Sequence, residues 1–168
     1  KKIIFGGHKM KRLVVDSSIC TGCRACETAC SSEHFEKFSP ELSRVRVVKI
    51  EEKGVDVPVT CKQCKNAPCI KACPVDALYK DPDTNATLVD HDKCISCGQC
   101  IEACPFAAIS MDNNDNIMIC DLCSGSPRCV EVCPVDAIKY EELGKVSQKK
   151  RIEYAEKEAE KVRRRWGL

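Results

Sequence analysis

The sequence contains few aromatic residues. Phe, Trp and Tyr together make up 5% of the 168 residues, whereas 31% of the residues are charged. Large aromatic side chains usually supply much of the buried area of a protein core. A chain with so few of them lacks the material for a generous side-chain core, so we expect something other than side chains to fill its centre.

Long apolar segments are also missing. No apolar run approaches the roughly 20 residues that a helix needs to cross a bilayer. The first residues, KKIIFGGHKMKRLVVD, are basic, but they contain neither the apolar stretch of a secretory signal nor its small-residue cleavage site. We therefore expect no direct membrane insertion and a reducing, cytoplasmic compartment.

The common catalytic motifs are absent from the sequence as well. It contains no GxGxxG segment, no Walker loop, no catalytic triad and no nucleophile next to a base. The three histidines, His8, His34 and His91, have no partner carboxylate or nucleophile at motif spacing, so we expect surface residues rather than ligands. The sequence predicts no catalytic residues in this chain.

Cysteine, by contrast, is abundant, with 16 residues that form four quartets and leave none over. The quartets are Cys20, Cys23, Cys26 and Cys30; Cys61, Cys64, Cys69 and Cys73; Cys94, Cys97, Cys100 and Cys104; and Cys120, Cys123, Cys129 and Cys133. The first and third share the spacing C-x2-C-x2-C-x3-C, while the second and fourth have a longer middle gap that contains a proline. The last three quartets end in similar segments, CPVDAL, CPFAAI and CPVDAI, whereas the first has Ser31 in place of the proline. The pattern indicates an internal duplication of a duplicated unit.

Three kinds of site could use these thiols: disulfides, zinc or iron-sulfur clusters. Zinc sites use two CxxC-type pairs that a longer spacer separates. Bacterial ferredoxins instead carry the run C-x2-C-x2-C-x3-C-P, in which the fourth cysteine ligates the other cluster of a pair. Small residues in the loops, among them Gly22, Ala25, Ser96 and Gly98, allow backbone N–H groups to approach a cluster closely. The spacing favours four 4Fe-4S clusters over zinc, and zinc over disulfides.

The segments between the quartets predict an α+β fold. Runs rich in β-branched residues predict short strands at 12–16, 44–50, 86–90 and 116–119. Short helices are expected after the third cysteine of a quartet, for example at 101–104 and 130–133. We therefore expect a duplicated ferredoxin-like fold of two 2x4Fe-4S units, with small β-hairpins, cluster loops and short helices.

The C-terminal residues 145–168 differ from the rest in composition. They carry nine Lys or Arg and four Glu, a net charge of +5, and the segment from Ser147 consists of strong helix formers. The apolar positions follow one helix stripe: Ile152, Ala155, Ala159, Val162 and Trp166. The segment predicts a basic helical tail, which either is solvated or lies on a partner subunit. We expect no nucleic-acid binding, because no recognition module accompanies the basic residues.

From Lys11 to about Tyr140 the sequence resembles the four-cluster ferredoxin-type subunits of the DMSO-reductase iron-sulfur subunit-like family, which serve molybdenum, tungsten and hydrogenase enzymes. The resemblance implies that the first quartet pairs with the fourth and the second with the third, a choice that spacing alone does not make. The implied ligand sets are Cys20, Cys23, Cys26 and Cys133; Cys120, Cys123, Cys129 and Cys30; Cys61, Cys64, Cys69 and Cys104; and Cys94, Cys97, Cys100 and Cys73.

The same resemblance implies the domains and the function. Residues 1–144 would form a four-cluster domain, with 11–60 and 106–140 around one cluster pair and 61–105 around the other, followed by the tail at 145–168. The chain would be a non-catalytic electron-transfer subunit of a hetero-oligomer. It would relay electrons between another carrier and a catalytic tungsten- or molybdenum-pterin subunit, most like those of aldehyde oxidoreductases and class II benzoyl-coenzyme A reductases. Iron-sulfur subunits of hydrogenase, formate or carbon monoxide dehydrogenase complexes are the alternative, and a structural zinc-binding module is the alternative of another class.

Overall fold

The computed structural model describes residues 10–166. Two units are distinguished: Arg12–Tyr140, which contains all sixteen cysteines, and the residues on either side of it. Within the described residues, no helix combines the length and the apolar character required to span a bilayer.

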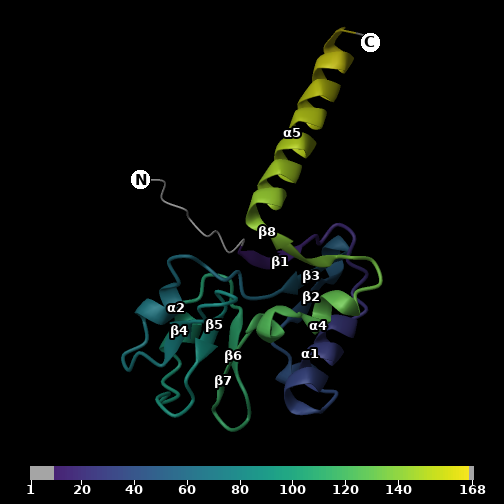
Figure 1. Cartoon of the computed structure of the whole chain (residues 1–168). Coiled ribbons are helices and arrows are strands. Elements are labelled where there is room, and N and C mark those ends of the chain that lie inside the picture. The colour runs from purple at the N-terminus through teal and green to yellow at the C-terminus, as the bar shows by residue number, and fades with distance from the viewer. Residues whose placement is uncertain (1–9, 167–168) are drawn as a thin grey trace, which may run out of the picture. The chain divides into compact units, whose positions relative to one another are not determined.

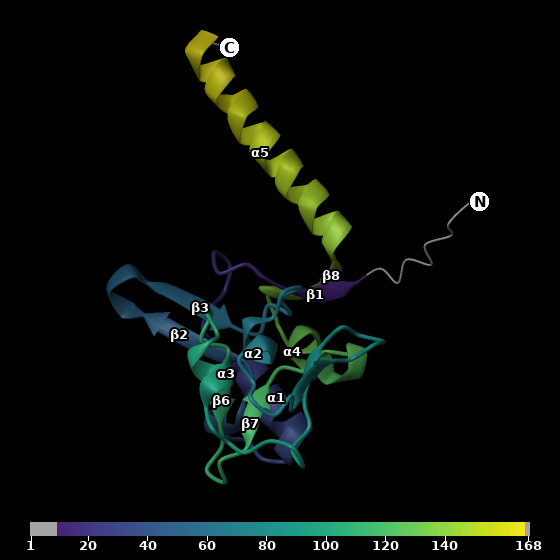
Figure 2. The same ribbon diagram turned by 90° about the vertical axis from the view of Figure 1, so that its left-hand side faces the viewer.

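The described strands form four two-stranded sheets (Figure 1). Strand β1 (Lys11–Val15) pairs with β8 (Ile138–Glu142), β2 (Arg46–Ile50) with β3 (Val55–Val59), β4 (Leu78–Lys80) with β5 (Thr87–Val89), and β6 (Ile109–Met111) with β7 (Ile117–Ile119). The last three pairs are antiparallel hairpins; Figure 2 shows the β2–β3 hairpin from the side. The four predicted strands are confirmed as β1, β2, β5 and β7, each shifted or shortened by one or two residues.

Four helices carry the third cysteine of each quartet. They are α1 (Ala25–Phe35), α2 (Pro68–Lys71), α3 (Gln99–Glu102) and α4 (Arg128–Glu131), and 3-10 turns lie at η1 (Pro40–Leu42), η2 (Glu51–Lys53) and η3 (Leu122–Gly125). The predicted helix bounds 101–104 and 130–133 were wrong by two residues, because the helices end before the fourth cysteine. Proline follows that cysteine in three quartets, and the residue before a proline disfavours helical conformation. The first quartet has Ser31 instead, so α1 continues through Cys30 to Phe35.

The packing of these elements follows the quartets. Helix α1 packs against α4, and α2 packs against α3. One apolar core contains Cys26, Cys30 and Cys129, and a second contains Cys61, Cys69 and Cys100. Cys120 packs against both. Of the aromatic side chains that the structure describes, none is buried. Aliphatic side chains share the two cores with the cysteines.

The C-terminal segment forms helix α5 (Leu143–Trp166), which begins four residues before the predicted helix. Two members of its apolar stripe, Ala155 and Ala159, are exposed, and the side chain of Ile152 is 52% exposed. The side chains of Val162 and Trp166 lie outside the described part of the chain. The helical prediction for this segment is confirmed.

Candidate metal centres

Three cavities in the Arg12–Tyr140 unit are each bounded by four cysteines. The first is lined by Cys20, Cys23, Cys26 and Cys133, the second by Cys30, Cys120, Cys123 and Cys129, and the third by Cys61, Cys64, Cys69 and Cys104. The empty space in them, open mouths included, is about 300, 310 and 310 Å³ respectively. In each, one quartet supplies three cysteines and a distant quartet supplies the fourth. The four-cysteine lining that they share indicates the same guest in all three.

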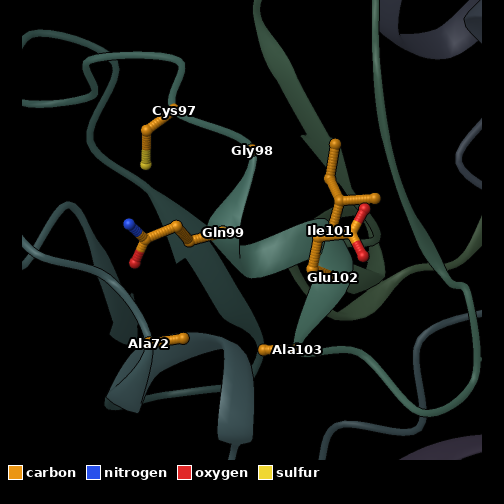
Figure 3. Close-up of a pocket in the computed structure, with 7 residues that line it drawn as sticks. All are labelled: Ala72, Cys97, Gly98, Gln99, Ile101, Glu102 and Ala103. Atoms are coloured by element: carbon orange, nitrogen blue, oxygen red, sulfur yellow. The ribbon is translucent and has the colours of Figure 1, made fainter.

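The remaining four cysteines lie around helix α3. Cys100 is buried, and Cys73 and Cys94 are partly buried against the same apolar core. Cys97 is exposed and borders an open hollow of about 840 Å³, solvent included, together with Ala72 at the end of α2 (Figure 3). The structure therefore brings three of these four to one core and leaves Cys97 facing the surface.

All four cysteine loops share one backbone feature. The residue two positions after the first cysteine has a positive φ in every quartet: 64° at Gly22, 48° at Gln63, 54° at Ser96 and 61° at Leu122. Left-handed residues in such turns direct successive N–H groups to one side and form concavities that bind anions, as at many iron-sulfur sites. At Gly22 a Cβ atom would also lie 2.4 Å from Asp56 Oδ2, so a side chain there would have to displace Asp56. The repeated loop fits an anionic group beside the thiols.

A second repeated turn follows the fourth cysteine of three quartets. The residue three positions later has a positive φ: 50° at Asp76, 48° at Ala107 and 54° at Asp136. Aspartate tolerates this conformation through local hydrogen bonding, whereas for alanine it costs about 1–2 kcal/mol. The strain at Ala107 indicates that the surrounding structure enforces the turn.

Backbone N–H groups donate to the sulfurs of three fourth-position cysteines. The pairs are Arg44 N to Cys30 Sγ at 3.3 Å, Ala77 N to Cys73 Sγ at 3.2 Å, and Ala137 N to Cys133 Sγ at 3.2 Å. Although burial opposes it, hydrogen bonds from Val75, Ala77 and Leu78 lower the pKa of Cys73 below its usual value. These donors would stabilise negative charge on the three sulfurs.

Burial has the opposite effect on the other thiols. It raises the pKa of Cys26 and Cys120 to about 12 and that of Cys61 and Cys100 to about 11, and it also raises the pKa of Cys129. A buried thiolate is unfavourable unless a cation compensates its charge. Thiol groups gathered in this way can therefore ionise only together with bound metal.

The donor set and its origin in two quartets together distinguish the three kinds of site. All sixteen cysteines are free thiols, so no disulfides join them. Zinc sites use two CxxC-type pairs around one ion, whereas each cavity here takes three cysteines from one quartet and the fourth from a distant quartet, as paired ferredoxin clusters do. The three four-cysteine cavities fit an iron-sulfur cubane better than one ion.

A buried glutamine joins the two apolar cores. Gln63 lies between Cys61 and Cys64 and is 3% exposed. Its Nε2 donates to the carbonyl oxygen of Cys120 at 2.7 Å, and its Oε1 accepts from the backbone N–H of Thr87, also at 2.7 Å. Sequence reasoning missed this residue, because nothing in CKQC distinguishes it from a solvent-exposed loop position.

His34 also differs from its prediction. The expectation of a surface residue was wrong: its side chain is 12% exposed, and Nε2 lies 3.7 Å from Cys123 Sγ and 3.5 Å from Asp121 Oδ1. Its position four residues after Cys30, on the same face of one helix, is the signal that could have located it. His91 is exposed as expected, and His8 lies outside the described residues.

Comparison with known proteins adds to this geometry. A family model described as a 4Fe-4S dicluster domain matches residues 53–143, and a model of a 4Fe-4S binding domain matches residues 17–33. The chain is 43% identical over 116 residues to the polyferredoxin-like subunit of aliphatic sulfonate oxidoreductase from Pyrococcus furiosus, covering 68% of this chain and 66% of that protein. It is 34% identical over 131 residues to a sulfite dehydrogenase subunit from Allochromatium vinosum, covering 66% and 55%. The chain thus spans less than two thirds of the length of either relative.

A solved structure, the active site complex BamBC of benzoyl coenzyme A reductase with benzoyl-CoA, contains a chain that is 27% identical to this one. The match has a TM-score of 0.47 and covers 79% of each chain.

Proposed function

This chain belongs to the 4Fe-4S dicluster domain family, and from that membership we propose that it is an electron-transfer subunit with four 4Fe-4S clusters. It would relay single electrons between a catalytic oxidoreductase subunit and another redox carrier. The observation that carries the proposal is the set of three cavities, each bounded by four cysteines from two distant quartets.

The proposed ligands are all sixteen cysteines. Three sets line the cavities. The fourth set consists of Cys73, Cys94 and Cys100, which lie in or against the second apolar core, and the exposed Cys97. The arrangement of four such sites from a duplicated sequence is supported by the loop conformation that all four quartets share. It is supported further by the pairing of α1 with α4 and of α2 with α3.

The protein's own groups would hold the clusters and adjust their charge. A bound 4Fe-4S cluster accepts and releases single electrons at a potential that its net charge, hydrogen bonds and exposure determine. Cysteine thiolates would supply the ligands, and the backbone N–H groups of Arg44, Ala77 and Ala137 would stabilise negative charge on the sulfurs. Cys23 and Cys97, the two exposed cysteines, lie where electrons could enter or leave.

The partner would be a catalytic subunit of an oxidoreductase. The relatives are named as subunits of sulfonate, sulfite and selenate oxidoreductases and of formate hydrogenlyase, and this supports a role inside a hetero-oligomeric complex. A tungsten- or molybdenum-pterin partner of the aldehyde oxidoreductase or benzoyl-coenzyme A reductase type follows from the sequence resemblance. The subunit would work in the cytoplasm, and its basic helix α5 would be available to an acidic partner surface.

Anaerobic metal analysis tests the cluster count. Four cubanes require about sixteen iron and about sixteen sulfide per chain. About twelve of each would mean that one proposed site does not bind a cluster, and stoichiometric zinc without sulfide would reject the proposal.

Purification from the native source under anaerobic conditions tests the role. The chain should copurify with a larger catalytic subunit. The isolated chain should accept electrons from a low-potential donor but convert no aldehyde or acyl-coenzyme A substrate. Turnover by the isolated chain would contradict a purely electron-transferring role.

A further inference from the structure

We propose that His34 raises the reduction potential of the cluster at Cys30, Cys120, Cys123 and Cys129 by donating a hydrogen bond from Nε2 to Cys123 Sγ. The inference rests on the proposed cluster at this site and assigns its potential to one side chain. It would make this cluster a better electron acceptor than a cluster in an otherwise similar cavity.

The surroundings of the His34 ring determine which nitrogen carries hydrogen. Nε2 lies 3.7 Å from Cys123 Sγ and 3.5 Å from Asp121 Oδ1. A thiolate and a carboxylate both accept hydrogen bonds and donate none, so Nε2 is the protonated nitrogen. A ring with hydrogen on Nε2 is consistent with both neighbours.

Asp121 is itself held in place by Arg44 and by the backbone of Cys123. Its Oδ2 forms an ion pair with Arg44 Nη1 at 2.7 Å, and its Oδ1 accepts from the backbone N–H of Cys123 at 2.9 Å. The backbone N–H of Arg44 donates to Cys30 Sγ at 3.3 Å. Two ligands of one cavity are thus tied to the same small network, which fixes the position of the imidazole beside Cys123.

The duplication provides an internal comparison. His34 is the fourth residue after the last cysteine of its quartet, and alanine occupies that position in the other three quartets, at Ala77, Ala108 and Ala137. The proline that ends the short helices is replaced by Ser31, so helix α1 continues and carries the imidazole to the cavity. The third cavity is also bounded by four cysteines, but Ala108, at the position equivalent to His34, offers no side-chain donor.

A donor to a cysteine ligand favours the more negative, reduced state of a cluster. Removing the donor in His34→Leu should therefore lower one of the four midpoint potentials. We expect the ratio of reduced to oxidised cluster at a fixed potential to fall about tenfold. This fall equals a lowering of the midpoint potential by about 59 mV for a one-electron couple. His34→Gln, whose amide nitrogen can take the place of Nε2, should shift the ratio by less than about threefold on the same scale.

The four midpoint potentials can be measured by potentiometric titration with electron paramagnetic resonance as the readout. The protein is first assayed for iron. The three other steps serve as internal references, and exposed His91→Leu is the matched control. An unshifted step in iron-replete His34→Leu, or an equal shift in His34→Leu and His34→Gln, would overturn the inference. A low iron content in wild-type protein would instead count against the proposed function.

A second measurement does not depend on the leucine variant retaining its cluster. Pulsed electron paramagnetic resonance of reduced wild-type protein labelled with ¹⁵N-histidine should show a weak nitrogen coupling, and the labelled His34→Gln variant should lack it. The absence of any coupling that distinguishes the two proteins would contradict a hydrogen bond from this ring to the cluster ligand.

Discussion

Replacement of Gln63 by alanine should loosen the connection between the two apolar cores. The wild-type side chain satisfies two backbone groups at 2.7 Å each, the Thr87 N–H and the Cys120 carbonyl. Thr87 is 1% exposed, so its N–H would lose its partner in a place that water does not reach. An unsatisfied buried donor costs about 2 kcal/mol and the less enclosed carbonyl about 1 kcal/mol, which gives about 3 kcal/mol in total.

The readout is the accessibility of iron to a chelator. If the cavities exchange iron through local opening, a loss of about 3 kcal/mol increases the open fraction about 100-fold, since each 1.4 kcal/mol is a factor of ten. Anaerobic protein would be mixed with a ferrous chelator, and the loss of the brown colour would be followed with time. Part of the colour loss should come from the clusters in the Cys61 and Cys120 cavities. We expect this kinetic phase to be about 100 times faster in Gln63→Ala than in wild type.

Ser96→Ala is the matched control. Ser96 occupies the equivalent loop position with a φ of 54°, so both substitutions place alanine in the same backbone conformation. Ser96 is exposed, and its replacement should change the bleaching rate by less than about threefold, as for a surface substitution within ±0.5 kcal/mol. Equal rates for the two variants would refute the assignment of a bridging role to Gln63.

Three further perturbations test other parts of the structure. Cys133→Ala should remove one iron, or the whole cluster, from the cavity of Cys20 while the cavity of Cys120 remains filled; the electron paramagnetic resonance spectrum would show a three-iron signal, and the opposite pattern would reject the pairing. Ala107→Gly should relieve the strain at φ 48° and raise the free energy of unfolding by about 1 kcal/mol in denaturant titration, more than Asp136→Gly does. Removal of iron and sulfide should abolish the compact fold, because metal binding and folding are coupled; a well-dispersed amide spectrum of the apo chain would contradict this.

The loop chemistry could be predicted from the sequence, because cysteine spacing is a local property. The short helices could also be predicted from the position of the third cysteine. Their ends could not, because the proline after the fourth cysteine ends each helix earlier than expected. Strand β3 was not predicted, since Pro58 reads as a strand breaker, yet in a two-stranded hairpin proline is tolerated at an edge. Strands β4 and β6 have three residues each and, unlike the equally short β5 and β7, contain at most one β-branched residue.

Contacts between distant segments could not be predicted in the same way. The roles of Gln63 and His34 depend on Cys120, Thr87, Asp121 and Cys123, and no periodicity connects these positions. The pairing of quartets is likewise a contact between distant segments. Spacing within a quartet is fixed by the loop, but the partner that supplies the fourth sulfur is fixed only by how helices and hairpins pack.

The pairing of β1 with β8 has a consequence for synthesis on the ribosome. Cys20, Cys23 and Cys26 leave the exit tunnel early, but Cys133 and β8, which close their cavity, follow more than a hundred residues later. At about 5–20 residues per second, the delay is about 5–20 s. The cavity of Cys61, Cys64, Cys69 and Cys104 is complete long before. The nascent chain would thus mature from its middle outwards, and its first thiols would wait longest, open to oxidation or to the wrong metal, until the last strand arrives.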